Sequence, residues 1–184
     1  ISGLLKPSSG KIKLESEILI SNDPSKIIQA GVGRIPEDRH KDGIVGQMSV
    51  AENMIIEDLN SSKIQSRGLL NHESIMRYCS DLSSKYDVRG PGPNASARVL
   101  SGGNIQKLIL ARVFEASPKL ILANQPPRGF DMGAAADVAN RLLEARQRGS
   151  GVILISEDLD EILSLSDRIM VIYDGKLRIA ETHD

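Results

Sequence analysis

The sequence is poor in cysteine, histidine and aromatic residues, and each shortage removes a class of function. Its one cysteine, Cys79, excludes a disulfide within the chain and a metal cluster built from cysteines. The three histidines, His40, His72 and His183, are too scattered to suggest a metal site. Aromatic residues make up 3% of the chain and tryptophan is absent, so stacking on bases or sugar rings is poorly supported. Cys79 lies on the apolar side of a helical pattern, which favours a buried thiol over a nucleophile.

Long hydrophobic runs and an excess of one charge are missing as well. No apolar stretch approaches the roughly 20 residues that cross a bilayer, and no signal peptide is visible. The formal net charge is −1, which gives no reason to expect nucleic-acid binding. The 184 residues are 40% hydrophobic and 26% charged, as in one globular domain or part of a larger one. The cytoplasm is the default location.

Apolar stretches of strand length alternate with helical patterns along the chain. Short apolar runs between turn residues predict buried strands at 31–36, 120–123 and 151–156. Helical patterns predict helices from Asp23 and at 49–59, 71–86, 131–148 and 158–164, with Asp23, Ser49 and Asp131 in cap positions. The first five residues are interpreted as the end of a helix, with strand segments at 12–14 and 18–20. Asp174-Gly175 predicts a type I′ hairpin between strands at 168–173 and 176–179. This alternation predicts an α/β layered fold.

The stretch Leu100-Ser101-Gly102-Gly103-Asn104 has the features of an anion-binding helix start. Ser101 stands where a helix cap belongs, and an apolar helical pattern follows it. The two glycines allow a ligand to approach the backbone closely, and N–H groups at a helix start favour phosphate. An ordinary capped helix after a tight turn would have the same short motif, so the motif alone leaves both interpretations open.

The longer string from Val99 to Lys107 resembles the signature motif of ATP-binding cassette (ABC) proteins, in the form found in sugar and nucleoside importers. The opening segment, 1–12, resembles the stretch that follows the phosphate-binding loop of this family, Gly-x-x-x-x-Gly-Lys-Ser/Thr, and the loop itself has no match in the sequence. The resemblance implies a three-layer, P-loop NTPase-like core with a parallel sheet, N-terminally truncated. Residues 1–45 and 99–184 would form this α/β core. Residues 46–98 would form an inserted helical subdomain that contacts a permease.

Three positions depart from the pattern of an active cassette. In ABC proteins the strand after the signature helix ends in Asp-Glu-Pro, where one acid helps to hold the metal and the other acts on water; here the residues are Asn124, Gln125 and Pro126. Amides carry no charge for Mg²⁺ and cannot take a proton from water at neutral pH. Loss of a general base typically costs about 10²- to 10⁴-fold in rate. Glu157 stands where the family has a histidine. The resemblance therefore implies a degenerate catalytic site and no metal ligand.

The resemblance also assigns nucleotide contacts. ABC dimers bind ATP between the phosphate loop of one cassette and the signature of the other, so residues 100–104 would complete the partner's site. Ser101 and the N–H of Gly103 would face the γ-phosphate, while ATP and Mg²⁺ would be held mainly by the partner. Asp131 would reach across the interface toward the partner's water, a role compatible with capping a helix. Glu37 occupies the place of a glutamine that senses the metal and the membrane partner; a solvated polar loop is the alternative.

The function implied is that of one half of a cassette pair that energises import of a nucleoside or simple sugar. The expected partners are the first ATP-binding cassette of the same polypeptide, transmembrane permease subunits and, indirectly, a substrate-binding lipoprotein, at the cytoplasmic face of the plasma membrane. Nucleoside-type importers are most similar, with ribose-type importers next. Two other functions stay open: a regulatory or scaffolding cassette that docks the permease, and a non-transporting cassette from DNA repair or translation. The latter would need coiled-coil or basic insertions, which the sequence lacks.

Overall fold

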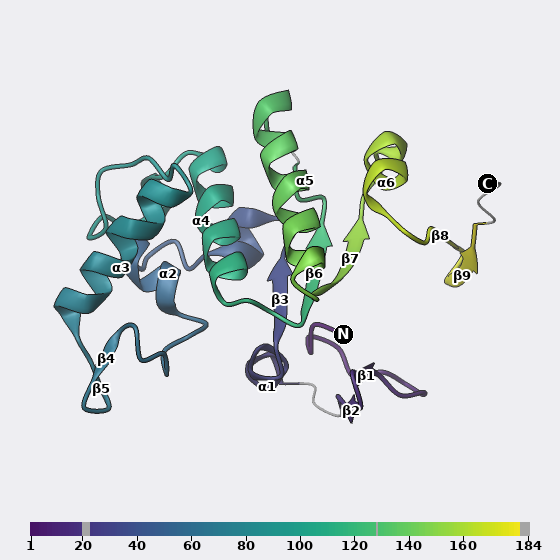
Figure 1. Ribbon diagram of the computed structural model, residues 1–184, viewed down its shortest axis with the longest axis horizontal. Coiled ribbons are helices and arrows are strands. Elements are labelled where there is room, and N and C mark those ends of the chain that lie inside the picture. The colour runs from purple at the N-terminus through teal and green to yellow at the C-terminus, as the bar shows by residue number, and fades with distance from the viewer. Residues whose placement is uncertain (20–22, 128, 181–184) are drawn as a thin grey trace.

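A three-stranded parallel sheet lies at the centre of the computed structural model, which describes residues 1–19, 23–127 and 129–180 (Figure 1). Its strands are β3 (Val32–Ile35), β6 (Leu120–Asn124) and β7 (Gly151–Ile155), in that order across the sheet. Helices separate these strands along the chain, as parallel connections require. The predicted α/β class is therefore confirmed. Because all three strands run the same way, the residues that follow them emerge at one edge of the sheet.

Four helices accompany the sheet: α1 (Pro24–Gln29), α4 (Gly102–Glu115), α5 (Met132–Gln147) and α6 (Leu159–Leu165). Figure 1 shows α4 beside β3 and α5 in front of β6 and β7. The predicted capping of α1 and α5 is confirmed, because the side chains of Asp23 and Asp131 each accept a hydrogen bond from a first-turn N–H group. Asp158 caps α6 in the same way, which the sequence analysis did not predict.

The segment 46–98 forms the helices α2 (Val50–Ile55) and α3 (His72–Lys85), which lie on the far side of α4 from α5 (Figure 1). Ser49 and Glu52 form a capping box at the start of α2: the serine Oγ accepts from the Glu52 N–H at 3.1 Å, and the glutamate accepts from the Ser49 N–H at 2.7 Å. Both helices were expected, although α2 ends four residues before the predicted 59.

A small hairpin between α2 and α3 was not anticipated from the sequence. It pairs β4 (Gln65–Ser66) with β5 (Leu69–Leu70) in antiparallel register. Arg67 (φ 54°) and Gly68 (φ 79°) are both left-handed, as a type I′ turn requires. The two strands have only two residues each, too few to show an alternating pattern.

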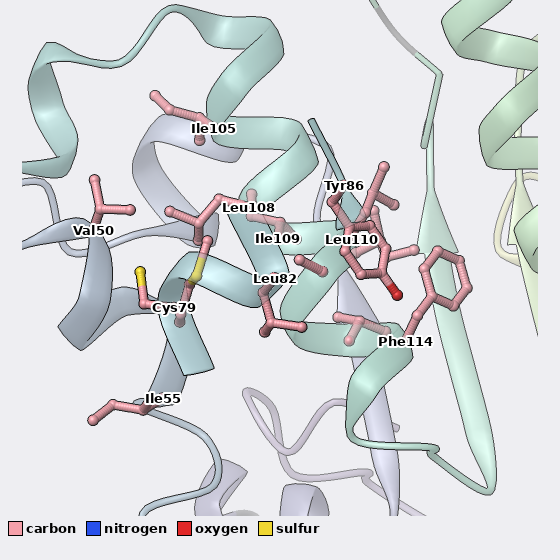
Figure 2. Close-up of a cluster of buried hydrophobic side chains, with 14 of the residues drawn as sticks. Val50, Ile55, Cys79, Leu82, Tyr86, Ile105, Leu108, Ile109, Leu110 and Phe114 are labelled. Atoms are coloured by element: carbon pink, nitrogen blue, oxygen red, sulfur yellow. The ribbon is translucent and has the colours of Figure 1, made fainter. Parts of the chain in front are cut away.

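The hydrophobic core is built around α4 (Figure 2). Ile105, Leu108 and Ile109 on this helix are fully buried. The predicted apolar face of α3 packs toward them, with Cys79 at 0% and Leu82 at 3% exposure. Burial raises the pKa of the Cys79 thiol, which agrees with a core residue rather than a nucleophile.

One strand differs from expectation, because β7 is buried on one face only. Val152 and Leu154 pack against the core on the side of α5, whereas Ile153 and Ile155 are 39% and 56% exposed. In the part of the chain that the structure describes, β7 pairs with β6 alone. An apolar run of five residues predicts a strand but does not reveal how many neighbours cover it.

The two ends of the described chain form hairpins rather than parts of the central sheet. The predicted helix at 1–5 is wrong: Gly3 has φ 78°, outside the helical range, and β1 (Lys13–Leu14) pairs with β2 (Glu17–Ile18) farther on. The strand expected at 18–20 is present only at Ile18, and residue 20 lies outside the described residues.

The second terminal hairpin was predicted correctly. Strands β8 (Met170–Tyr173) and β9 (Lys176–Ile179) pair around Asp174 (φ 45°) and Gly175 (φ 69°), the left-handed pair of a type I′ turn. Every residue of both strands is exposed. Across the described residues, no helix is long and apolar enough to span a membrane.

Candidate functional site

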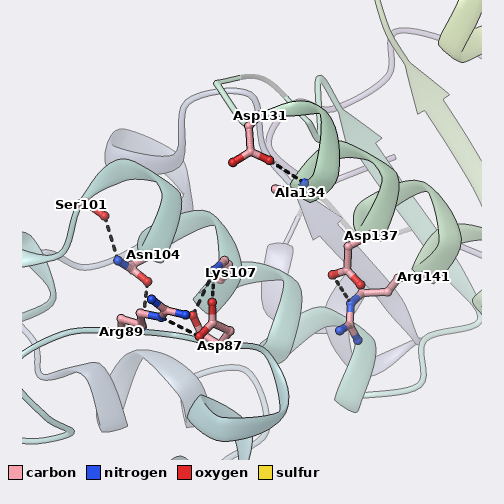
Figure 3. Close-up of polar contacts among 9 residues, drawn as sticks. All are labelled: Asp87, Arg89, Ser101, Asn104, Lys107, Asp131, Ala134, Asp137 and Arg141. Carbon is pink, nitrogen blue, oxygen red and sulfur yellow. Dashed lines mark hydrogen bonds and ion pairs between the residues drawn. The ribbon is translucent and has the colours of Figure 1, made fainter.

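The start of α4 presents a hydroxyl and backbone N–H groups at the surface. Ser101 is exposed and occupies the cap position, with extended backbone angles (φ −65°, ψ 156°). Its side chain makes no capping hydrogen bond and instead accepts one from Asn104 Nδ2 at 2.8 Å (Figure 3). Since the hydroxyl oxygen is the acceptor in that contact, its own hydrogen can still be donated to a ligand. This helix start therefore has the donors that an anion needs.

Asn104 is held in place by the segment that follows α3. Its Oδ1 accepts from the backbone N–H of Arg89 at 2.7 Å. Asp87 forms ion pairs with Lys107 and Arg89, each at 2.7 Å (Figure 3). Hydrogen bonds from Lys107 and Arg89 hold the pKa of Asp87 below its usual value. The orientation of the Ser101 hydroxyl thus depends on contacts between the first turns of α4 and residues 87–89.

The remaining signature residues differ in how deeply they are buried. Leu100 is 6% exposed and belongs to the hydrophobic core, where a methyl group added to Gly90 would overlap its side chain. Its side chain is therefore directed away from any ligand at the surface and anchors the segment. Gly102, Gly103 and Asn104 are half-buried.

The other predicted site residues follow the three central strands at one edge of the sheet. Glu37 lies two residues after β3 and is exposed, and Glu157 lies two residues after β7 and is exposed. Asn124 ends β6 and is half-buried. Gln125 has a left-handed backbone (φ 50°), and its N–H donates to the Ile155 carbonyl at 2.8 Å. The parallel sheet thus brings the residues that sequence reasoning assigned to a degenerate site to the same edge.

This edge suits a divalent metal poorly, whereas the start of α4 suits phosphate. Among the residues that the structure describes, no three His, Cys, Asp or Glu side chains are grouped so that they could hold a metal ion. Asn124 and Gln125 offer only neutral amide oxygens. By contrast, Ser101 offers a hydroxyl donor, and the two half-buried glycines that follow it add no side chains that could block a ligand.

Two further contacts connect α4 to the loop that leads into α5. The buried Gln106 donates from Nε2 to the carbonyl oxygen of Pro126 at 2.9 Å, although sequence reasoning gave it no role. A methyl group at Gly103 would lie 3.8 Å from the ring of Phe130. Asp131, the next residue, is exposed and accepts from the Ala134 N–H at 2.9 Å, so its predicted capping role is confirmed (Figure 3).

Arg39 is a residue of this region that sequence reasoning left in a polar loop. It begins η1 (Arg39–Gly43), one turn with π-helical hydrogen bonding that follows β3. A methyl group at Gly102 would lie 2.9 Å from Arg39 Nη2, and one at Gly129 would lie 3.1 Å from the same atom. The guanidinium therefore lies against the starts of two separate segments. The sequence feature that could have pointed to Arg39 is its positive charge, two residues after the predicted site residue Glu37.

Comparison with known protein families gives one match to the greater part of the chain. The sequence model of a family described as ABC transporter matches residues 1–127. The nucleoside import ATP-binding protein NupA of Lactococcus lactis subsp. cremoris (strain MG1363) is 44% identical over 178 residues, which are 97% of this chain and 35% of that protein. The guanosine import ATP-binding protein NupO of Bacillus subtilis (strain 168) is 40% identical over 96% of this chain and 35% of its own length.

A ribose import ATP-binding protein, RbsA of Lactococcus lactis subsp. cremoris (strain SK11), is 34% identical over 96% of this chain and 36% of its own length. The chain thus spans about a third of the length of the curated relatives that it matches. Among solved structures, the dimeric post-hydrolysis state of the ATP-binding cassette MJ0796, bound to ADP and Pi, superposes with a TM-score of 0.74. That match has 20% sequence identity and covers 100% of this chain and 78% of the other. The expected fold, that of an ABC ATPase cassette, is confirmed.

Proposed function

Because this chain belongs to the ABC transporter family, we propose that it is an ATP-binding component of an importer that completes the nucleotide site of a second cassette. One observation carries the proposal: the exposed Ser101 hydroxyl stands at a helix start that its own side chain leaves uncapped. The residues at the chain's own sheet edge are amides, Asn124 and Gln125, where hydrolysis would need acids. The chain is thus equipped to contact phosphate and poorly equipped to hydrolyse it.

In this proposal, residues 100–104 face the γ-phosphate of ATP held by the partner cassette. Ser101 donates its hydroxyl hydrogen while Asn104 holds the oxygen, and the Gly103 N–H lies beside it. Bound Mg²⁺ would neutralise phosphate charge, and it would be held mainly by the partner, because Asn124 and Gln125 stand where this chain would need acidic ligands. The Asp131 carboxylate caps α5 and extends toward the partner's water.

The degenerate catalytic site of this cassette would consist of Asn124, Gln125 and Glu157. Neither amide can accept a proton from water at neutral pH, so no general base acts at the end of β6. Glu157 is exposed beyond β7, where its carboxylate would repel a phosphate group rather than stabilise it. Glu37, at the same edge, is proposed to sense the bound nucleotide and the membrane partner.

The proposed assembly contains a first ATP-binding cassette in the same polypeptide and two permease subunits, with a substrate-binding lipoprotein acting through them. The import proteins that this chain resembles are about three times its length, which leaves room for a second cassette. Their names support a nucleoside as cargo, with ribose as the alternative. Residues 46–98 would form the helical subdomain that faces the permease, and the complex would lie at the cytoplasmic face of the plasma membrane.

The second candidate function is a regulatory or scaffolding cassette that docks the permease without productive nucleotide contact. The loss of both acids after β6 is the observation that favours it. The two functions differ in what they require of Ser101, since a scaffold has no need of its hydroxyl.

Ser101→Arg in the polypeptide that carries both cassettes separates these functions. The arginine side chain would fill the space of the γ-phosphate, so ATP turnover and nucleotide-driven closure should be abolished. Ser25→Arg, at an exposed position on α1 outside residues 46–98, is the matched control and should leave turnover unchanged. Wild-type turnover in Ser101→Arg would favour the scaffold.

A further inference from the structure

Three segments that are distant in sequence meet at the Arg39 side chain. The first turn of α4 approaches it at Gly102, and the loop before α5 approaches it at Gly129; an added methyl group would lie 2.9 and 3.1 Å from Nη2, respectively. A Cβ atom at Gly102 would be closer to Nη2 than real Cβ atoms come to other heavy atoms, so the end of the Arg39 side chain would have to move away from α4. The guanidinium is half-buried there.

The turn that carries Arg39 is fixed at both ends. At its start, the Asp38 carboxylate accepts from the backbone N–H groups of His40 and Lys41 at 3.1 and 3.0 Å. At its end, the carbonyl oxygen of Gly43 accepts from Arg112 Nη2 at 2.9 Å. Gly43 also packs against Ile109 so closely that an added methyl group would overlap it. Because Arg112 and Ile109 belong to α4, η1 is bound to the same helix whose first turn its arginine touches.

The Arg112 side chain also contacts residues 53 and 57, so the residue that binds the end of η1 to α4 is itself fixed by several neighbours. Its side chain is 7% exposed and forms an ion pair with Glu57 at 3.0 Å. Its Nη1 donates to the Asn53 carbonyl at 3.2 Å. The position of Arg39 is therefore set by buried contacts on α2 and α4 rather than by a loose surface loop.

We propose that Arg39 is a positioning residue that sets the separation between the start of α4 and the start of α5, and so between Ser101 and Asp131. The inference rests on the proposed function, in which both residues face one nucleotide of the partner cassette. A planar guanidinium can pack flat against glycine backbone, which the ammonium group of lysine does not reproduce. Its positive charge adds to that of the α4 start and so favours a phosphate group there.

A double-mutant cycle between Arg39→Ala and Gly102→Ala tests the contact in the polypeptide with both cassettes. Gly102 has no left-handed φ, so alanine fits its backbone, and the added methyl group meets chiefly the arginine. We expect each single change to raise the ATP concentration for half-maximal turnover about tenfold, the fold-change that corresponds to about 1.4 kcal/mol. The double variant should be no worse than Arg39→Ala alone, and Arg39→Lys should not restore wild-type behaviour.

Amide hydrogen exchange without nucleotide gives a second readout that does not depend on ATP turnover. In Arg39→Ala, exchange in residues 101–106 and 129–134 should be faster than in the wild type, because both segments lose the same neighbour. Arg77→Ala is the matched control: this arginine is exposed on α3 and pairs only with Glu73 in the described ion pairs. It should leave exchange in both segments unchanged.

Additive effects of the two substitutions, full rescue by Arg39→Lys, or unchanged exchange in both segments would each overturn the positioning role. Failure of the proposed function has a different signature. If Ser101→Arg keeps wild-type turnover while Arg39→Ala still speeds exchange, the shared nucleotide site is wrong and the structural contact remains.

Discussion

The Asp131 carboxylate has both a structural role and a proposed functional role. It accepts the Ala134 N–H at the start of α5, and it is exposed on the side of the molecule where the first turn of α4 contacts Phe130. An N-cap contributes about 1 kcal/mol to stability, and asparagine caps as well as aspartate does. The two roles can therefore be separated by substitution at this single position.

We predict that Asp131→Ala destabilises the chain by about 1 kcal/mol, while Asp131→Asn stays within a few tenths of the wild type. Urea denaturation measures both. In the polypeptide with both cassettes, Asp131→Asn should nevertheless lower ATP turnover, because the charge near the partner's water is lost. If the asparagine variant is as unstable as the alanine variant, the cap is not the stabilising contact.

For single residues, the sequence predicted contacts within one helical turn, but it did not predict contacts between residues that are far apart in the chain. The caps at Asp23, Ser49 and Asp131 follow from side chains that bond their own next turn, and each is present. Ser101 was expected to cap α4, but its hydroxyl is taken by Asn104. The role of Arg39 depends on glycines that lie 63 and 90 residues away in sequence, and no local pattern reports such a contact.

Arg112 joins three elements, because it extends from α4 to the end of η1 and to α2. It pairs with Glu57 at 3.0 Å and donates to the carbonyl oxygens of Gly43 and Asn53 at 2.9 and 3.2 Å. Its side chain is 7% exposed, so its charge is stabilised almost entirely by these neighbours. One buried guanidinium thus adds polar contacts to the apolar packing of η1 and α2 against α4.

Replacing Arg112 by leucine should destabilise the chain by about 3 kcal/mol or more, because it leaves a carboxylate and two carbonyls without their donor. Chemical denaturation of the purified chain measures the loss. Arg77→Leu removes an exposed pair, whose partners are 72% and 82% exposed, and should cost less than about 1 kcal/mol. Equal effects of the two substitutions would show that burial does not strengthen the Arg112 contacts.

Elements with strong helical spacing and a cap were predicted well, and short or irregular ones were not. The apolar steps of α3 and the capping box of α2 are local signals, and both helices begin within a residue of the expected position. The two-residue strands β4 and β5 and the turn η1 contain too few residues for any periodic pattern. They are set by packing against their surroundings.

In the molecule as a whole, two buried groups and one half-buried group make the stability depend on alkaline pH. Burial raises the pKa of Tyr78, Cys79 and Tyr86, and the neighbouring Glu115 carboxylate raises the two tyrosines further. Each group is neutral when protonated, and each pKa is higher in the folded than in the unfolded chain. At pH values below the pKa of these groups in the unfolded chain, the stability that comes from the pKa difference is fully present. At higher pH the unfolded chain loses its protons first, so the free energy of unfolding declines.

We therefore predict that the urea midpoint falls steadily as pH rises beyond about 9, where unfolded cysteine and then tyrosine begin to ionise. Tyr86→Phe should reduce this fall, since it removes the group held protonated by both burial and Glu115. Denaturation at several values between pH 7 and 11 provides the measurement. A midpoint that stays constant across this range would contradict the burial of these groups.

The α/β class followed from the alternation of patterns, but the exposure of the strands did not. Ile155 and the strand β8 are apolar and exposed, although their composition suits a buried sheet. The apolar pattern of a strand is visible in its own residues, whereas the burial of that strand depends on which other segments pack against it. Among the described residues, none pairs with the outer edge of β7.

In the proposed function, the start of α4 contacts a nucleotide held by another cassette. The most direct measurement uses the polypeptide with both cassettes and an ATP analogue with a photoreactive group on the γ-phosphate, followed by mass spectrometry of the cross-linked peptides. The account predicts cross-links within residues 100–104 that disappear in Ser101→Arg. Cross-links confined to other peptides, with equal yield in the wild type and Ser101→Arg, would contradict it.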